Sequence, residues 1–85
     1  MVQDRAAMNG FPFEPGDLVR SRILLASNLA RHQPGTVLMF CKHYCTPDGV
    51  HKFIMWHGPT QATFVLGRDR DPNEVADQWF ERVSP

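Results

Sequence analysis

The sequence has no run of about 18 or more apolar residues, which excludes a membrane-spanning helix of ordinary length. It also has no excess of either charge, because 9 Lys and Arg residues balance 9 Asp and Glu residues. Nucleic-acid-binding proteins usually carry a basic excess or stripe, so the balanced charge disfavours that class. The class stays open, since Arg20, Arg22 and Arg31 are near enough in sequence to cluster.

Cysteine is scarce as well, because the chain has only 2, at positions 41 and 45. A disulfide between such near neighbours in one strand closes almost no loop, so a fold built on disulfides is excluded. We therefore expect reduced thiols. The first residues, MVQDRAAMNG, lack the basic start and the apolar segment of a signal peptide, and a cytoplasmic location is the resulting expectation.

What the chain does contain is typical of one small globular domain. It has 85 residues, of which 42% are hydrophobic and 11% aromatic, too many for a disordered chain. Residues 1–10 are polar and mixed, and we interpret them as a flexible tail. Residues 11–85 form the predicted domain, in which we find no internal repeat and no low-complexity segment.

Turn-forming residues divide this domain, and the clearest turn lies in the middle of the chain. In Thr46-Pro-Asp-Gly-Val50, proline presets the first turn position and Gly49 accepts a left-handed backbone. This pattern predicts a three-residue loop with a G1 bulge. The residues on both sides favour strands, as in Val37-Leu-Met-Phe-Cys41 and Phe53-Ile-Met-Trp56. The sequence therefore predicts a central hairpin over residues 36–57.

Residues 17–33 fit two secondary structures. As a helix, they are capped by Asp17 and ended by Pro34-Gly35, with their apolar side chains on one broad face. As a strand, Leu18 to Ile23 alternates and is followed by a long loop. The helix gives an α+β fold of αβββα order, whereas the strand gives a small barrel of about five strands. We favour the mainly β barrel and keep the αβββα order as the alternative.

The C-terminal part opens with a helix-start signal. Asp71 is a capping residue, Pro72 suits the first turn, and Glu74 completes the pattern. A short helical turn is predicted near residues 72–77. The residues leave open whether Trp79 to Val83 continues this helix or forms a final strand.

The order of these signals resembles that of bacterial SH3-like β-barrel domains. The matching pieces are Glu14-Pro-Gly-Asp-Leu-Val-Arg20, Pro34-Gly-Thr-Val-Leu38, Asp48-Gly49, Phe53-Ile-Met-Trp-His-Gly58 and Gln78-Trp-Phe-Glu-Arg-Val83. The chain is also similar to the barrel of the nitrile hydratase β subunit at residues 15–20, 30–35 and 76–81, although its middle departs from that family. The resemblance implies a single SH3-like domain over residues 11–85. It also implies a partner-binding role, because that barrel is a subunit domain and not the catalytic centre.

Cysteine and histidine side chains gather in residues 41–57. Side chains alternate along a strand, so Cys41, His43 and Cys45 share one face. A three-residue loop places Cys45 opposite His51, so that Cys45, His43 and His51 gather near the hairpin tip, with paired Cβ atoms ~5 Å apart. The same register pairs His43 with Phe53, Cys41 with Met55 and Met39 with His57.

These three side chains are suitable zinc ligands, with a fourth supplied from elsewhere, such as His32. A zinc site is therefore one alternative, although a four-residue loop would split the cluster between two faces. The plainer interpretation is a half-buried cysteine pair with solvent-facing histidines and no cofactor. We also expect no enzyme, because the thiol and imidazole groups lack an identifiable orienting group or oxyanion donor.

The opposite face of the hairpin carries Lys42, Tyr44, Lys52 and Trp56. Aromatic rings beside cations suit a small barrel that binds nucleic acid. The alternative for the tryptophan is a place in the core, beside Phe40 and Ile54.

Two adjacent aromatic residues, Trp79 and Phe80, would point to opposite faces of a strand, one in the core and one exposed. Exposed aromatic and arginine side chains are typical anchors of protein interfaces. We therefore expect a non-enzymatic interaction module that binds a protein partner. Its role would be that of a small subunit or a regulator, such as a phage or mobile-element inhibitor. The candidate contacts are Tyr44, Trp56, Trp79, Phe80, Arg20 and Arg22, and binding of nucleic acid or zinc is the alternative.

Overall fold

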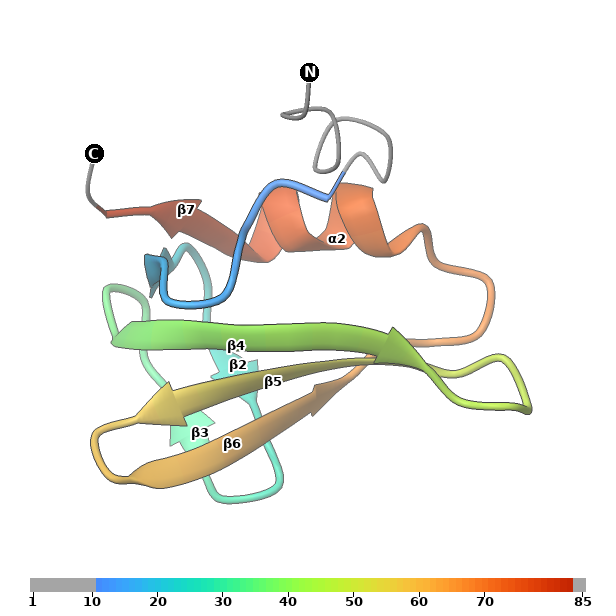
Figure 1. Ribbon diagram of the computed structural model, residues 1–85. Helices are drawn as coiled ribbons and strands as arrows, with labels where there is room; N and C mark the ends of the chain where they lie inside the picture. The colour runs from blue at the N-terminus through green and yellow to red at the C-terminus, as the bar shows by residue number, and fades with distance from the viewer. Residues whose placement is uncertain (1–10, 84–85) are drawn as a thin grey trace.

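The computed structural model describes residues 11–83, so the predicted tail at residues 1–10 lies outside the described residues. Of the described residues, 45% lie in strands and 11% in a helix (Figure 1). The elements are β1 (Leu18–Ser21), β2 (Leu25–Ala26), β3 (Arg31–His32), β4 (Val37–Cys45), β5 (His51–His57), β6 (Thr60–Val65), α2 (Pro72–Trp79) and β7 (Phe80–Arg82). Within residues 11–83, no helix is both long and apolar enough to span a membrane.

The strands form one antiparallel sheet of five strands and a separate pair. The order in the large sheet is β6-β5-β4-β1-β7, and β2 pairs with β3. Figure 1 shows β4, β5 and β6 side by side, with β7 and α2 beyond β4. The mainly β prediction is confirmed, but the sheet does not close into a barrel. An SH3-like assignment therefore stays a prediction.

The alternative αβββα order is wrong, because residues 17–33 contain strands and no helix. β1 pairs with both β4 and β7, so two neighbouring strands satisfy its backbone. The alternating interpretation is confirmed for Leu18–Ser21, since Val19 and Ser21 are buried while Leu18 and Arg20 are exposed. The strand ends before the predicted Ile23, and the predicted loop contains the short strands β2 and β3. Ile23, on the apolar face of the hypothetical helix, is 45% exposed. Pairing within the sheet thus overrides the helical periodicity.

The C-terminal helical turn is confirmed, and it extends two residues beyond the predicted range, to Trp79. Asp71 caps it, accepting a hydrogen bond from the backbone N–H of Asn73. Phe80 has extended backbone dihedrals and begins β7. The sequence left open whether Trp79 to Val83 continues the helix or forms a strand. In the structure the helix ends at Trp79 and a strand follows directly.

The core lies on one face of the large sheet, which we call the inner face. Its cross-strand partners include Val19 with Leu38 and Phe53 with Phe64. α2 adds Val75 and Ala76, and β7 adds Phe80, all of them buried. Burial of one such large apolar side chain contributes about 1.5–3 kcal/mol. The largest fully buried side chains are Phe53, Phe64, Phe80, Leu38, Met55, Val19 and Val75.

The central hairpin is confirmed, with its strands at Val37–Cys45 and His51–His57. Its three-residue loop is closed by the Thr46 N–H, which donates to the Val50 carbonyl at 2.8 Å, and Gly49 has a φ of 89°. Near the tip the predicted register is confirmed, because Cys45 lies opposite His51. The four-residue loop is therefore excluded.

Farther from the tip the predicted register is wrong, because a β-bulge between Phe40 and Lys42 shifts the pairing by one residue. Met55 pairs with Phe40 instead of Cys41, and Met39 pairs with Trp56 instead of His57. The bulge lies where β4 stops pairing with β1, whose last partner is Met39. A bulge bends a strand and increases its local twist, so β4 can follow two neighbours that run over different lengths.

Candidate functional site on the outer face of the sheet

The side of the large sheet opposite the core, which we call the outer face, carries four rows of cross-strand partners. Residues directly opposite each other in antiparallel strands project from the same face, so the pairing defines each row. The rows are Glu81, Arg20 and Val37; Leu18, Met39, Trp56 and Gln61; Lys42, Ile54 and Thr63; and Tyr44, Lys52 and Val65.

Three aliphatic side chains at one end of this face are exposed, although Ile54 on the same face is buried. Leu18 is 42% exposed, Val37 is 46% exposed and Met39 is 39% exposed, and these three occupy adjacent positions on β1 and β4. Trp56 continues the same patch on β5, where it lies opposite Met39 and is half-buried. The outer face therefore has an apolar patch made of Leu18, Val37, Met39 and Trp56, which spans three strands.

The candidate contacts Tyr44 and Trp56 both lie on this outer face. Tyr44 lies opposite Lys52, and the Lys42 Nζ is 5.5 Å from the centroid of the Tyr44 ring. A cation at this distance over an aromatic face is attracted to it. Trp56 is not part of the buried core cluster, whereas Phe40 is. The alternative that placed Trp56 in the core beside Phe40 is therefore wrong.

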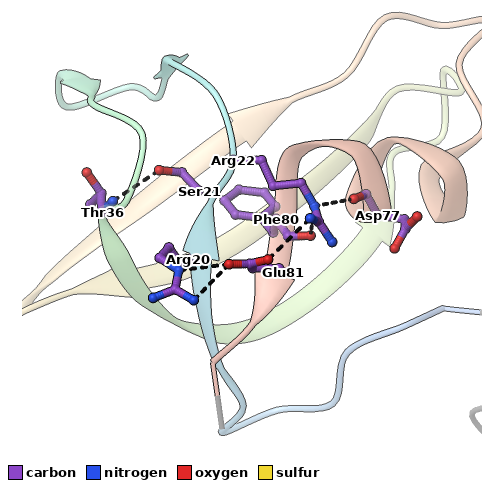
Figure 2. A network of polar contacts seen from close by, with 7 residues as sticks. All are labelled: Arg20, Ser21, Arg22, Thr36, Asp77, Phe80 and Glu81. Carbon is purple, nitrogen blue, oxygen red and sulfur yellow. Dashed lines mark hydrogen bonds and ion pairs between the residues drawn. The ribbon is translucent and has the colours of Figure 1, made fainter.

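Arg20 and Arg22, two further candidate contacts, are held by β7 and α2 (Figure 2). Arg20 Nε donates to Glu81 Oε2 at 2.9 Å, and an Arg22 terminal nitrogen lies 3.2 Å from Glu81 Oε1. Arg22 Nε also donates to the backbone carbonyls of Asp77, at 2.8 Å, and Phe80, at 3.0 Å. A cation that satisfies carbonyls at a helix C-terminus stabilises the helix end. Both arginines therefore have an internal role.

Trp79 and Phe80 differ in exposure, as expected for one core residue and one surface residue. Phe80 is 0% exposed, so it has no surface to offer a partner, and its place among the candidate contacts is wrong. Its ring packs edge-on against Phe64, with centroids 5.5 Å apart. Trp79 is half-buried at the end of α2, and its ring contacts Phe53 at 6.2 Å.

The hairpin tip brings together two of the three candidate zinc ligands. His43 Nε2 and His51 Nδ1 are 3.0 Å apart, and the His43 ring stacks on Phe11 at 4.8 Å. Burial lowers the pKa of His43 below its ordinary value, and the neighbouring His51 lowers it further. Both rings are half-buried and not fully solvent-facing.

Cys45, the third candidate ligand, directs its thiol to the Thr46 carbonyl at 3.4 Å. Both cysteines are free thiols. Across residues 11–83, no group of three or more His, Cys, Asp or Glu side chains is arranged to hold a metal ion. A zinc site at the hairpin tip therefore has no geometric support beyond the pair of imidazoles.

His32, considered above as a fourth ligand, lies in a second histidine pair that sequence reasoning missed. It is 4% exposed, its ring contacts His57 at 5.2 Å, and its Nε2 is 2.9 Å from Ser27 Oγ. Burial lowers the pKa of His32, and His57 lowers it further. His57 and His51 stand at opposite ends of β5, about 20 Å apart at strand rise, so the two pairs are separate.

No family model, no curated protein and no solved structure matches the chain. The SH3-like assignment and the likeness to the nitrile hydratase β subunit are thus neither supported nor opposed by a relative.

Proposed function

We propose that the chain is a non-enzymatic interaction module that binds a protein partner through the apolar patch of Leu18, Val37, Met39 and Trp56. The exposure of Leu18, Val37 and Met39 beside the half-buried Trp56 carries the proposal. Contiguous apolar surface of this kind marks interaction sites, and Met and Trp are enriched in interfaces. We also propose that it acts in the cytoplasm as a small subunit or as a regulator, such as a phage or mobile-element inhibitor.

The position of Trp56 within the patch indicates which side chain should contribute most to partner binding. Trp56 lies in the row that crosses β1, β4, β5 and β6, with Met39 on one side and Gln61 on the other. A half-buried tryptophan is fixed by its neighbours before a partner arrives, so little side-chain entropy is lost on binding. Trp56 is therefore the expected energetic centre of the contact.

Nucleic-acid binding is the second candidate, and the Lys42, Tyr44 and Lys52 cluster supports it. An exposed ring with two cations nearby can stack on a base and contact phosphates. The aliphatic side chains Leu18 and Val37 have no such use, because they do not stack on bases. For this reason the protein partner is favoured.

The test is affinity capture from a native-cell lysate, with the wild-type chain and two variants as bait. Met39→Arg places a charge in the apolar patch, whereas Leu24→Arg makes the same kind of change at a residue that is 49% exposed and outside the outer face. The proposal expects one protein that is retained by the wild type and Leu24→Arg, and lost with Met39→Arg. Circular dichroism must show that all three baits are folded.

The captured protein is then purified, and its affinity for each bait is measured by calorimetry. Equal affinity for the wild type and Met39→Arg would overturn docking on the outer face. Binding of a fluorescent oligothymidine that weakens steeply with salt, in the absence of any protein partner, would favour the nucleic-acid candidate.

A further inference from the structure

Two lysines on the outer face form no ion pair with the part of the chain that the structure describes. Four ion pairs join side chains within residues 11–83, and neither Lys42 nor Lys52 takes part in one. Glu81, the carboxylate in the outer-face rows, is already bound by Arg20 and Arg22. The apolar patch therefore adjoins two ammonium groups that are free to bind an anion.

The nearest carboxylate at the hairpin tip is also occupied. Asp48 accepts a short hydrogen bond from the Thr46 hydroxyl, and its carboxylate is 3.6 Å from Arg68. The hydrogen bond from Thr46 is the main reason why the pKa of Asp48 is lowered, and Lys52 contributes only a minor part. Lys52 thus lies near a negative charge without being paired to it.

The edges of the large sheet leave little room for a partner that would add a strand. On β6, the Thr63 N–H donates to Asn28 Oδ1 at 2.8 Å, and the Thr63 carbonyl accepts from the Asn28 N–H at 3.2 Å. On β7, the Phe80 N–H bonds to Ala76 and the Phe80 carbonyl accepts from Arg22. Blocked edge groups of this kind oppose strand addition. A partner is therefore expected to lie on the face.

A second copy of this chain is a poor occupant of the same face. Two outer faces placed together would bring Lys42 and Lys52 of each copy against a surface without a free carboxylate. Like charges across an interface oppose association. The charge on the face is better matched by a different protein that carries carboxylates.

From these observations we propose that the outer face binds an acidic segment of a partner protein, with apolar side chains on the Leu18, Met39 and Trp56 row and a carboxylate on Lys42 and Lys52. The inference rests on the proposed function and specifies the chemistry of the partner. Lys42 pairs with Ile54 and Lys52 with Tyr44, so the two lysines are diagonal neighbours. Diagonal neighbours lie about 7–8 Å apart, within reach of one carboxylate or of two adjacent ones.

The test is selection of a displayed random peptide library on the full chain. We expect the enriched peptides to combine aromatic or aliphatic residues with Asp or Glu. Synthetic copies should bind the double variant Lys42→Glu/Lys52→Glu roughly tenfold more weakly than the wild type, because two attractive charge pairs become repulsive. The matched control is Arg31→Glu/Arg70→Glu, which changes the net charge equally at two arginines without an ion pair in the described chain.

The possible outcomes separate this inference from the proposed function. Acidic peptides that lose affinity with both Met39→Arg and the lysine variant, but not with the arginine control, would support both. Enriched peptides that need Met39 but lack acidic residues would overturn the acidic partner and leave the face as a docking site. Enriched peptides that bind equally with Met39→Arg, or a library that yields no binder, would count against the proposed function itself. Oligothymidine that competes with the peptides would reassign the lysines to phosphate.

Discussion

Leu38 and Met39 are neighbours in β4, yet they belong to two different surfaces. Leu38 is 1% exposed on the inner face, in the core to which α2 contributes Val75 and Ala76, whereas Met39 is 39% exposed on the outer face. Both faces carry large apolar side chains; the inner face holds the buried core, whereas the outer face buries Ile54 and leaves Leu18, Val37 and Met39 exposed. The fold needs the inner face for its stability, whereas Leu18, Val37 and Met39 on the outer face keep much of their surface in contact with water. This difference is the reason why we assign binding to the outer face.

The sharpest test of this comparison is truncation of the two neighbours. Leu38→Ala should lower the free energy of unfolding by about 2–5 kcal/mol, because it removes buried methyl groups and leaves a cavity. Met39→Ala should lower it by less than about 1 kcal/mol, since its side chain already contacts water. Urea denaturation followed by circular dichroism measures both. Similar losses for the two variants would mean that the outer face also supports the fold.

A smaller effect is expected where the chain holds α2 against β1. Arg22→Ala should cost about 1 kcal/mol, because it leaves the Asp77 and Phe80 carbonyls without their charged donor (Figure 2). Arg20→Ala is the matched control, since Arg20 is paired with the half-buried Glu81 carboxylate at the surface and its loss should cost less. Thermal unfolding of the two variants compares them. A larger loss with Arg20→Ala would show that the outer-face ion pair, and not the helix end, matters more.

Acid should lower the stability of the fold through the buried His32 and the half-buried His43. The folded chain lowers the pKa of His43 and of His32, so the unfolded chain binds more protons once the pH falls below the ordinary histidine value of about 6.5. Stability from these groups is therefore fully present above that pH and is lost as the pH falls toward the lowered pKa values. Urea midpoints between about pH 7.5 and about pH 5 measure the loss.

The control for this prediction is His43→Phe, which keeps an aromatic ring against Phe11 and Phe53 but removes the titrating group. The variant should lose less stability over the same pH interval than the wild type. The loss that remains in the variant should include the contribution of His32. An unchanged pH dependence would show that His43 is protonated in the folded chain as readily as in the unfolded chain. The two proteins have the same carboxylates, so the difference between their pH dependences reports the His43 imidazole together with its contact to His51.

The sequence predicts this fold well wherever local turn chemistry decides it. The Pro-Asp-Gly turn after Thr46 and the cap at Asp71 depend on a few adjacent residues, and both are found in the structure. Residues 17–33 could not be resolved in this way, because their apolar spacing fits a helix and a strand. The choice is made by β4 and β7, which pair with β1 from distant parts of the chain.

The candidate site was predictable only in part, for the same physical reason. Alternation along the strands placed Tyr44 and Lys52 on one face, since this needs only the local register. The bulge beside Cys41 could not be foreseen, because it arises where the pairing of β4 with β1 ends. The internal role of Arg22 likewise depends on the position of α2, a contact over 55 residues of sequence. The exposure of Leu18 and Val37 depends on which face of the sheet is covered by other elements, and the residues around them in sequence do not indicate this.

The smallest stability effect is expected at the edge of the sheet, where Asn28 occupies both backbone groups of Thr63. Asn28→Ala removes the acceptor for the Thr63 N–H, which water can replace at an exposed edge, so the cost should be about 0.5–1 kcal/mol. The opened edge should instead promote pairing between chains, seen as a sedimentation coefficient that rises with concentration. Asn28→Asp keeps the acceptor oxygen and should stay monomeric. If Asn28→Ala also sediments as a monomer at every concentration, this asparagine does not guard the edge. Strand addition at β6 would then have to be considered beside docking on the outer face.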